Sequence, residues 1–149
     1  MSAGDATERS AAFLLGQLER GVQITEKRRA LWRCYAQHLA SLEQEGFISL
    51  PLLEDSTGHN GHIFFFFTRT ASERVELVNH LMASGVTALS HYVPLHAAPY
   101  GRELGNSFGD LPVTEALSSR ILRLPLYDEM SLEQVNFVCD CIDRFFEDT

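Results

Sequence analysis

The chain has 149 residues, of which 45% are hydrophobic and 21% charged, which is the size and composition of one globular domain. Its formal net charge of -8 argues against binding to nucleic acid or to an anionic membrane surface, because both are polyanions. No basic segment leads into an apolar stretch at the N-terminus, the apolar run at 63–67 is too short to span a bilayer, and the three cysteines are an odd number. We therefore expect a reduced, cytoplasmic setting.

Apolar residues at helical spacing predict two helices at the start of the chain, at about 6–21 and 24–45. Gly21 is placed to break the first helix, and Gly46 stands where a glycine commonly ends a helix. The apolar positions are Ala11, Leu14, Leu15 and Leu18 in the first helix and Ile24, Leu31, Trp32, Tyr35, Leu39 and Leu42 in the second.

A strand is predicted at 62–69, after a polar loop at 53–61. Its four consecutive phenylalanines place two rings on each face of a sheet, so both faces should be at least partly covered. Thr70 and Glu73 have the spacing of a capping box, which opens a helix at 71–84. The residues of this helix expected to point inward are Val75, Val78, Leu81 and Met82.

The second half of the chain alternates short strands with helices. Strands are predicted at 86–92 and 121–126, with a long loop at 97–112 and a short helix near 114–119 between them. A second capping box opens the last helix at 131–146, with Val135, Val138, Cys139, Ile142 and Phe145 inward. Because the strands are few and short, we expect an α+β two-layer domain, with a small sheet of about three strands and helices mainly on one face.

Two histidines and a tyrosine gather where the second predicted strand meets the long loop: His91, Tyr92 and His96, around Pro94. Pro94 cannot continue a central strand, so the chain leaves the sheet here, and such junctions often carry binding groups. The alternative is a rigid turn with incidental histidines. The loop histidines lack the ligand spacing of zinc motifs, so no metal site is expected from them, and a metal-binding domain is kept only as a third, weaker alternative; these histidines are His59, His62, His91 and His96.

Five ordered motifs cover the chain from about Ala11 to Phe146. They are A-A-F-L-L-G-Q-L-E at 11–19, I-x-x-x-R-x-x-L-W-x-x-Y at 24–35, N-G-H-I-F at 60–64, H-Y-V-P-L-H-x-x-P at 91–99, and R-L-P-L-Y at 123–127 before M-S. In this order and spacing they resemble the DegT/DnrJ/StrS sugar aminotransferases. The resemblance implies that 11–149 form the C-terminal small domain of a fold-type I pyridoxal-phosphate-dependent transferase, and that 1–10 are a poorly matched segment.

The resemblance also implies amino transfer from glutamate to a dTDP-linked 4-keto-6-deoxyhexose, with pyridoxal phosphate as cofactor. In the family, the lysine that forms the Schiff base belongs to an N-terminal large domain, which we expect this chain to lack. The single lysine here, Lys27, lies between Glu26 and Arg28 on a charged helix face and is expected to be a surface residue. We therefore expect the chain alone to bind no cofactor and to be inactive.

By resemblance, contacts with the substrate fall on His91, Tyr92 and His96, and secondarily on Asn60 and His62. Imidazole and phenol groups can form hydrogen bonds with a diphosphate or a sugar hydroxyl. The expected partners are the missing large domain or a second copy of the chain, and a sugar nucleotide. The alternative is a non-catalytic small-domain remnant that serves as a binding or interaction module.

Overall fold

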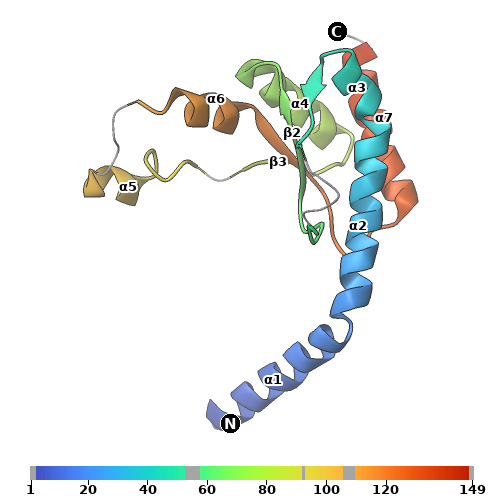
Figure 1. Ribbon diagram of the computed structural model, residues 1–149, viewed down its shortest axis with the longest axis vertical. Coiled ribbons are helices and arrows are strands. Elements are labelled where there is room, and N and C mark those ends of the chain that lie inside the picture. Colours follow the sequence, from blue (N-terminus) through green and yellow to red (C-terminus); the bar gives the residue numbers. More distant parts are fainter. Residues whose placement is uncertain (1–2, 53–57, 92, 106–109, 148–149) are drawn as a thin grey trace.

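The computed structural model describes residues 3–52, 58–91, 93–105 and 110–147 (Figure 1). Helices α1 (Ala3–Glu19), α2 (Gly21–His38) and α3 (Ala40–Gln44) begin the chain. The helix predicted at 24–45 is interrupted at Leu39, which ends α2 and precedes α3. Helix α1 extends away from the rest of the protein (Figure 1), and four of its apolar side chains are exposed: Phe13, Leu14, Leu15 and Leu18. Within the described residues, no helix is both long enough and apolar enough to cross a membrane.

A four-stranded antiparallel sheet lies at the centre of the fold. It contains β1 (Ile48–Ser49), β2 (Phe64–Thr68), β3 (Leu89–Ser90) and β4 (Ile121–Leu124) in the order β1-β2-β4-β3. The sheet has one strand more than the expected number of about three. The added strand, β1, is only two residues long and so shows no alternation in the sequence.

The two faces of the sheet have different environments, as the alternation of side chains along β2 shows. Phe64 and Phe66 are completely buried, and the Phe64 ring lies 4.9 Å from that of Tyr35 on α2. Phe65 and Phe67 face the other way and are only partly buried. The predicted α+β fold, with helices mainly on one face, is confirmed. The buried core contains Leu31, Tyr35, Leu39, Phe64, Phe66, Leu77, Leu81, Leu122, Val135, Val138 and Ile142.

The two predicted capping boxes open the helices α4 (Ala71–Ala83) and α7 (Leu132–Glu147). The Glu73 backbone N–H donates to Thr70 Oγ1 at 3.1 Å. At α7 the contact is reciprocal: the Gln134 N–H donates to Ser131 Oγ at 3.3 Å, and the Ser131 N–H donates to Gln134 Oε1 at 2.9 Å. Both helix starts are therefore confirmed.

The predicted inward face of α4 was partly wrong. Of the residues predicted to point inward, Leu81 is fully buried, but Val75 and Met82 are exposed. Leu77, which was not predicted, is fully buried. The inward stripe runs through Glu73, whose carboxylate accepts a hydrogen bond from the Arg69 backbone N–H at 2.8 Å. A prediction based only on the spacing of apolar residues does not place a charged residue on the inward face.

The last helix also buries more than the predicted set. Cys141 and Phe146 are buried together with Cys139 and Ile142, while Phe145 is only partly buried. Helix α7 packs against both α2 and α4, so side chains on more than one stripe of the helix are covered.

The region predicted as a long loop contains a helix. Helix α5 (Pro99–Leu104) begins at a proline, which suits the first helical turn, and ends at Gly105 in the left-handed conformation, φ +63°. Helix α6 (Pro112–Arg120) begins earlier than predicted and runs directly into β4. Helix α5 lies on an arm that projects sideways from the sheet (Figure 1).

Candidate functional site

The loop before β2 is held against α2 by backbone contacts. Arg29 donates from Nη2 to the Gly58 carbonyl at 2.8 Å and from Nε to the His59 carbonyl. Gly61 has φ +62°, and a Cβ on it would lie 3.0 Å from the Arg28 carbonyl carbon. A side chain at this position would be strained by the positive φ and crowded by the α2 backbone, so glycine is favoured here.

This loop positions the second group of predicted site residues, Asn60 and His62. Asn60 Oδ1 accepts a hydrogen bond from the His62 N–H at 3.2 Å and lies 2.9 Å from His62 Nδ1. The two polar side chains are thus held together at the start of β2, and both are exposed. They line an open cavity of about 440 Å³, whose other walls include Trp32, His59 and Phe65.

His91 follows β3 and is partly buried. Its pKa is lowered from the ordinary histidine value, first by loss of solvent and then by the positive charge of Arg123 and the neighbouring His62. His91 is therefore neutral at pH 7, when one ring nitrogen can donate and the other can accept a hydrogen bond. A small cavity of about 140 Å³ is lined by His62, Leu89 and Arg123 among others. The fold thus brings His62 and His91 into one neighbourhood, although the sequence separates them by a helix.

His96 is placed elsewhere. Its Nε2 lies 3.4 Å from Glu115 Oε1 on α6. It lines a different cavity of about 490 Å³, together with Leu95, Gly101 and Leu104. Tyr92 lies outside the described residues. The predicted set is therefore divided: Asn60 and His62 precede β2, His91 follows β3 within electrostatic reach of His62, and His96 lies beside α5 and α6.

Arg123 is a residue of this neighbourhood that was not among the predicted site residues. It lies in the middle of β4, paired across the sheet with Phe65 on one side and Leu89 on the other. In the sequence it was noted only as the first residue of the motif R-L-P-L-Y at 123–127. A fixed positive charge on an otherwise apolar sheet face is suited to contact with an anion.

The residues of this chain do not fit a covalent cofactor site for pyridoxal phosphate. Lys27 is exposed on α2, between the exposed Glu26 and the partly buried Arg28. A Schiff-base lysine needs an enclosed setting that positions it against the cofactor. An exposed side chain on a charged helix face does not provide one.

The chain matches the family model described as the DegT/DnrJ/EryC1/StrS aminotransferase family over residues 4–143. It is 30% identical over 138 residues to a GDP-perosamine synthase of Escherichia coli O157:H7, covering 93% of this chain and 36% of that protein. It is 31% identical over 141 residues to a dTDP-3-amino-3,4,6-trideoxy-alpha-D-glucose transaminase of Streptomyces venezuelae, covering 94% of this chain and 36% of that one.

Solved structures agree with the sequence comparison. The fold superposes on S. venezuelae DesV, solved in complex with a ketimine intermediate, with a TM-score of 0.80 and 31% identity over 92% of this chain and 36% of that one. The chain spans about a third of the length of these relatives, and the matching third is a small domain of the aminotransferase. The family depends on pyridoxal phosphate, and another solved relative holds the pyridoxamine form of the cofactor. The chain belongs to the DegT/DnrJ/EryC1/StrS aminotransferase family.

Proposed function

We propose that residues 11–149 are the C-terminal small domain of a nucleotide-sugar aminotransferase, which supplies substrate contacts and works with a large domain that carries the cofactor. The observation that carries this proposal is the proximity of His91 to both Arg123 and His62 in a chain of this family, with Arg123 and His62 also lining one small cavity. The exposed position of Lys27 supports the assignment of the cofactor to the large domain and not to this chain. In a complete enzyme, pyridoxal phosphate would supply the electron sink for amino transfer.

The chemistry of the cluster suits the anionic part of a sugar nucleotide. Arg123 provides a permanent positive charge, which pairs with phosphate oxygens. Neutral His91 and the Asn60–His62 pair provide donors and acceptors that match sugar hydroxyls or phosphate oxygens. Tyr92 and His96 complete the proposed substrate-contacting set, with His96 reaching the substrate from the α5–α6 arm.

We propose a dTDP-linked 4-keto-6-deoxyhexose as the acceptor and glutamate as the amino donor. This choice rests on the resemblance of the sequence motifs to dTDP-4-amino-4,6-dideoxygalactose transaminase, an enzyme of surface-polysaccharide synthesis. The named relatives act on dTDP-linked and GDP-linked sugars, so a dTDP sugar and a GDP sugar should be compared directly. We further propose that the protein works in the cytoplasm.

The large domain would cover surfaces that are exposed in this chain. Helix α1 presents Phe13 and Leu18, which are 72% and 66% exposed. On the open face of the sheet, Phe65 and Phe67 are partly exposed. Apolar groups of this size on a surface usually mark an interface.

The test is complementation. A large-domain fragment of a dTDP-sugar transaminase is loaded with pyridoxal phosphate, mixed with this chain and with glutamate as amino donor, and assayed for conversion of a dTDP-4-keto-6-deoxyhexose to the amino sugar with release of 2-oxoglutarate. We expect turnover that requires both parts. Arg123→Gln and His91→Ala should raise KM or abolish turnover, whereas Arg102→Gln, on the exposed surface of α5, should not.

The decisive comparison is with the fragment's own small domain. If that domain restores turnover as a separate chain and this chain does not, the proposal is wrong, and the alternative of a non-catalytic binding module takes its place. Binding of the dTDP sugar to this chain alone, unaffected by Arg123→Gln, would also contradict the proposed site.

A further inference from the structure

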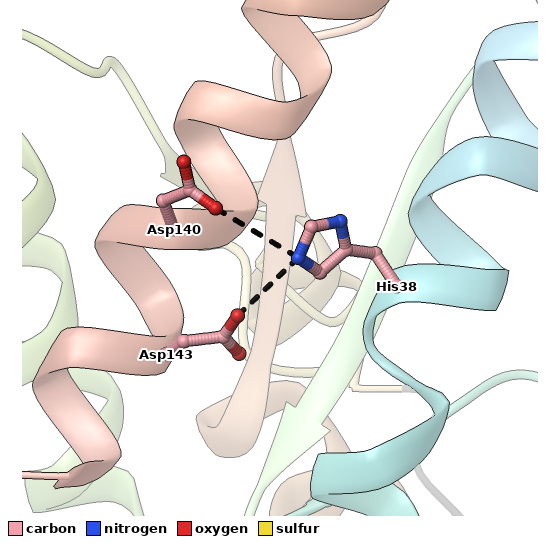
Figure 2. A group of neighbouring side chains, drawn as sticks. All are labelled: His38, Asp140 and Asp143. Atoms are coloured by element: carbon pink, nitrogen blue, oxygen red, sulfur yellow. Dashed lines mark ion pairs between the residues drawn. The ribbon is translucent and has the colours of Figure 1, made fainter.

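A second cluster of polar side chains lies away from the proposed substrate surface, where α2 faces α7. His38 is the last residue of α2, and Asp140 and Asp143 lie three residues apart on α7. Figure 2 shows the imidazole ring pointing between the two carboxylates. His38 Nε2 lies 3.3 Å from Asp143 Oδ2 and 3.8 Å from Asp140 Oδ1. One nitrogen and two oxygens thus converge from two helices.

The spacing of these atoms is close to that of ligands around a metal ion. Atoms bound about 2.0–2.1 Å from a tetrahedral zinc ion lie about 3.3–3.4 Å from one another. The three donor atoms of this cluster all lie within 4.8 Å of one another. Small rotations of the exposed Asp140 side chain would therefore complete the spacing without movement of either helix.

The two helices that carry the cluster are packed against each other, and a cavity adjoins the cluster. Helices α2 and α7 pack along their length, with Leu39 and Ile142 fully buried next to the cluster. A cavity of about 400 Å³ adjoins it, lined by His38 and Asp143 together with Glu45 and Glu147. The cavity gives space for water molecules to fill the coordination positions that the protein leaves open.

The arrangement of carboxylates favours a cation. Asp140 and Asp143 both face the imidazole of His38, and Glu45 and Glu147 line the adjoining cavity. A divalent cation would offset the charge of the two aspartates. The guanidinium of Arg144 is directed elsewhere, donating to the Asp140 backbone carbonyl and to Cys141 Sγ.

We propose that His38, Asp140 and Asp143 form a binding site for a divalent first-row transition cation, with zinc as the reference ion. Imidazole nitrogen with carboxylate oxygen is a ligand set that suits zinc and its neighbours, whereas magnesium and calcium prefer oxygen alone. The ion would join the end of α2 to the middle of α7. Its role is to stabilise the packing of these helices, and it takes no part in the chemistry of the substrate surface.

The competing explanation is that His38 pairs with the two aspartates and binds no metal. The two explanations differ in the response to added zinc: a metal site binds the ion through these three side chains, whereas a plain set of ion pairs does not.

The test uses this 149-residue chain after treatment with a chelator. Calorimetric titration with zinc should show one equivalent bound, cobalt should give visible absorption bands of a low-symmetry site, and zinc should raise the unfolding temperature. His38→Gln and Asp143→Asn should each weaken zinc binding at least about tenfold. Asp128→Asn, which removes a carboxylate paired with Arg20, and His59→Gln, in the loop before β2, should leave the affinity unchanged.

Histidine NMR of the unsubstituted chain gives a reading that does not depend on how the variants fold. Zinc should shift the ring signals of His38 and leave those of His80 in place. The proposal is overturned if the folded chain binds no zinc, if His38→Gln and Asp143→Asn bind it as tightly as the unsubstituted chain, or if the shifted signals belong to the loop histidines.

Discussion

His91 shows how a single residue is tuned by its neighbours. Its pKa lies below 6.5 in the folded chain because burial, the charge of Arg123 and the nearby His62 disfavour the imidazolium. We predict that Arg123→Gln raises the pKa of His91 without restoring it to 6.5, since burial is the larger cause and remains. The measurement is an NMR titration of the histidine ring signals, and Arg102→Gln is the control.

The sign of the pH effect on stability follows from the same shift. The unfolded chain takes up a proton on this histidine near pH 6.5, whereas the folded chain resists it to lower pH. The contribution of His91 to stability is therefore fully present above pH 6.5 and is lost as the pH falls through its folded pKa. A His91 that titrates at or above 6.5 in the unsubstituted chain would contradict the assigned environment.

Strand β2 offers a comparison at the scale of one element. Phe66 is fully buried beneath the helices, and Phe65 is partly exposed on the opposite face. We predict that Phe66→Ala lowers the free energy of unfolding by about 3–5 kcal/mol, the usual cost of removing a buried ring. Phe65→Ala should cost less than half of that. Urea denaturation of both variants measures the difference, and equal losses would show that both faces are equally buried in solution.

Helix α4 allows a second prediction at this scale. Thr70 accepts a hydrogen bond from the Glu73 N–H at the start of the helix. Thr70→Ala should lower the free energy of unfolding by about 1 kcal/mol, as loss of a helix cap does. Thr114→Ala, an exposed position in the first turn of α6, is the matched control and should change stability by less than about 0.5 kcal/mol. If both variants lose the same amount, the cap contributes nothing specific.

Many large apolar side chains are exposed on the surface of the molecule, instead of being buried in its core. Helix α1 lies outside the core (Figure 1), and its side chains Leu15 and Leu18 are exposed. We predict that the chain associates with itself as its concentration rises, because these groups are removed from water in the process. Sedimentation equilibrium should show this association, and the double substitution Leu15→Glu with Leu18→Glu should weaken it. Gln17→Glu adds charge to the same helix without removing an apolar group, and should leave the association largely intact.

Local rules predicted most of the elements of this chain. The capping residues Thr70 and Ser131 marked two helix starts, because a cap is a contact between residues three apart. The four phenylalanines of β2 predicted cover on both faces of the sheet, because strand geometry sends successive side chains to opposite sides; the structure buries one pair of rings completely and the other pair partly. The motif around His91 identified the family, which the comparison with known proteins confirmed.

Only the tertiary structure decided how the functional groups are grouped. It placed His91 near His62 and Arg123, and moved His96 to the α5–α6 arm, although His91 and His96 are five residues apart. It also brought His38 to Asp143 on a helix more than a hundred residues later. Such pairings depend on strand order and on helix packing, which are sums of many weak contacts between distant segments. No local spacing in the sequence contains that information, because spacing reports only which residues share a face of the same element.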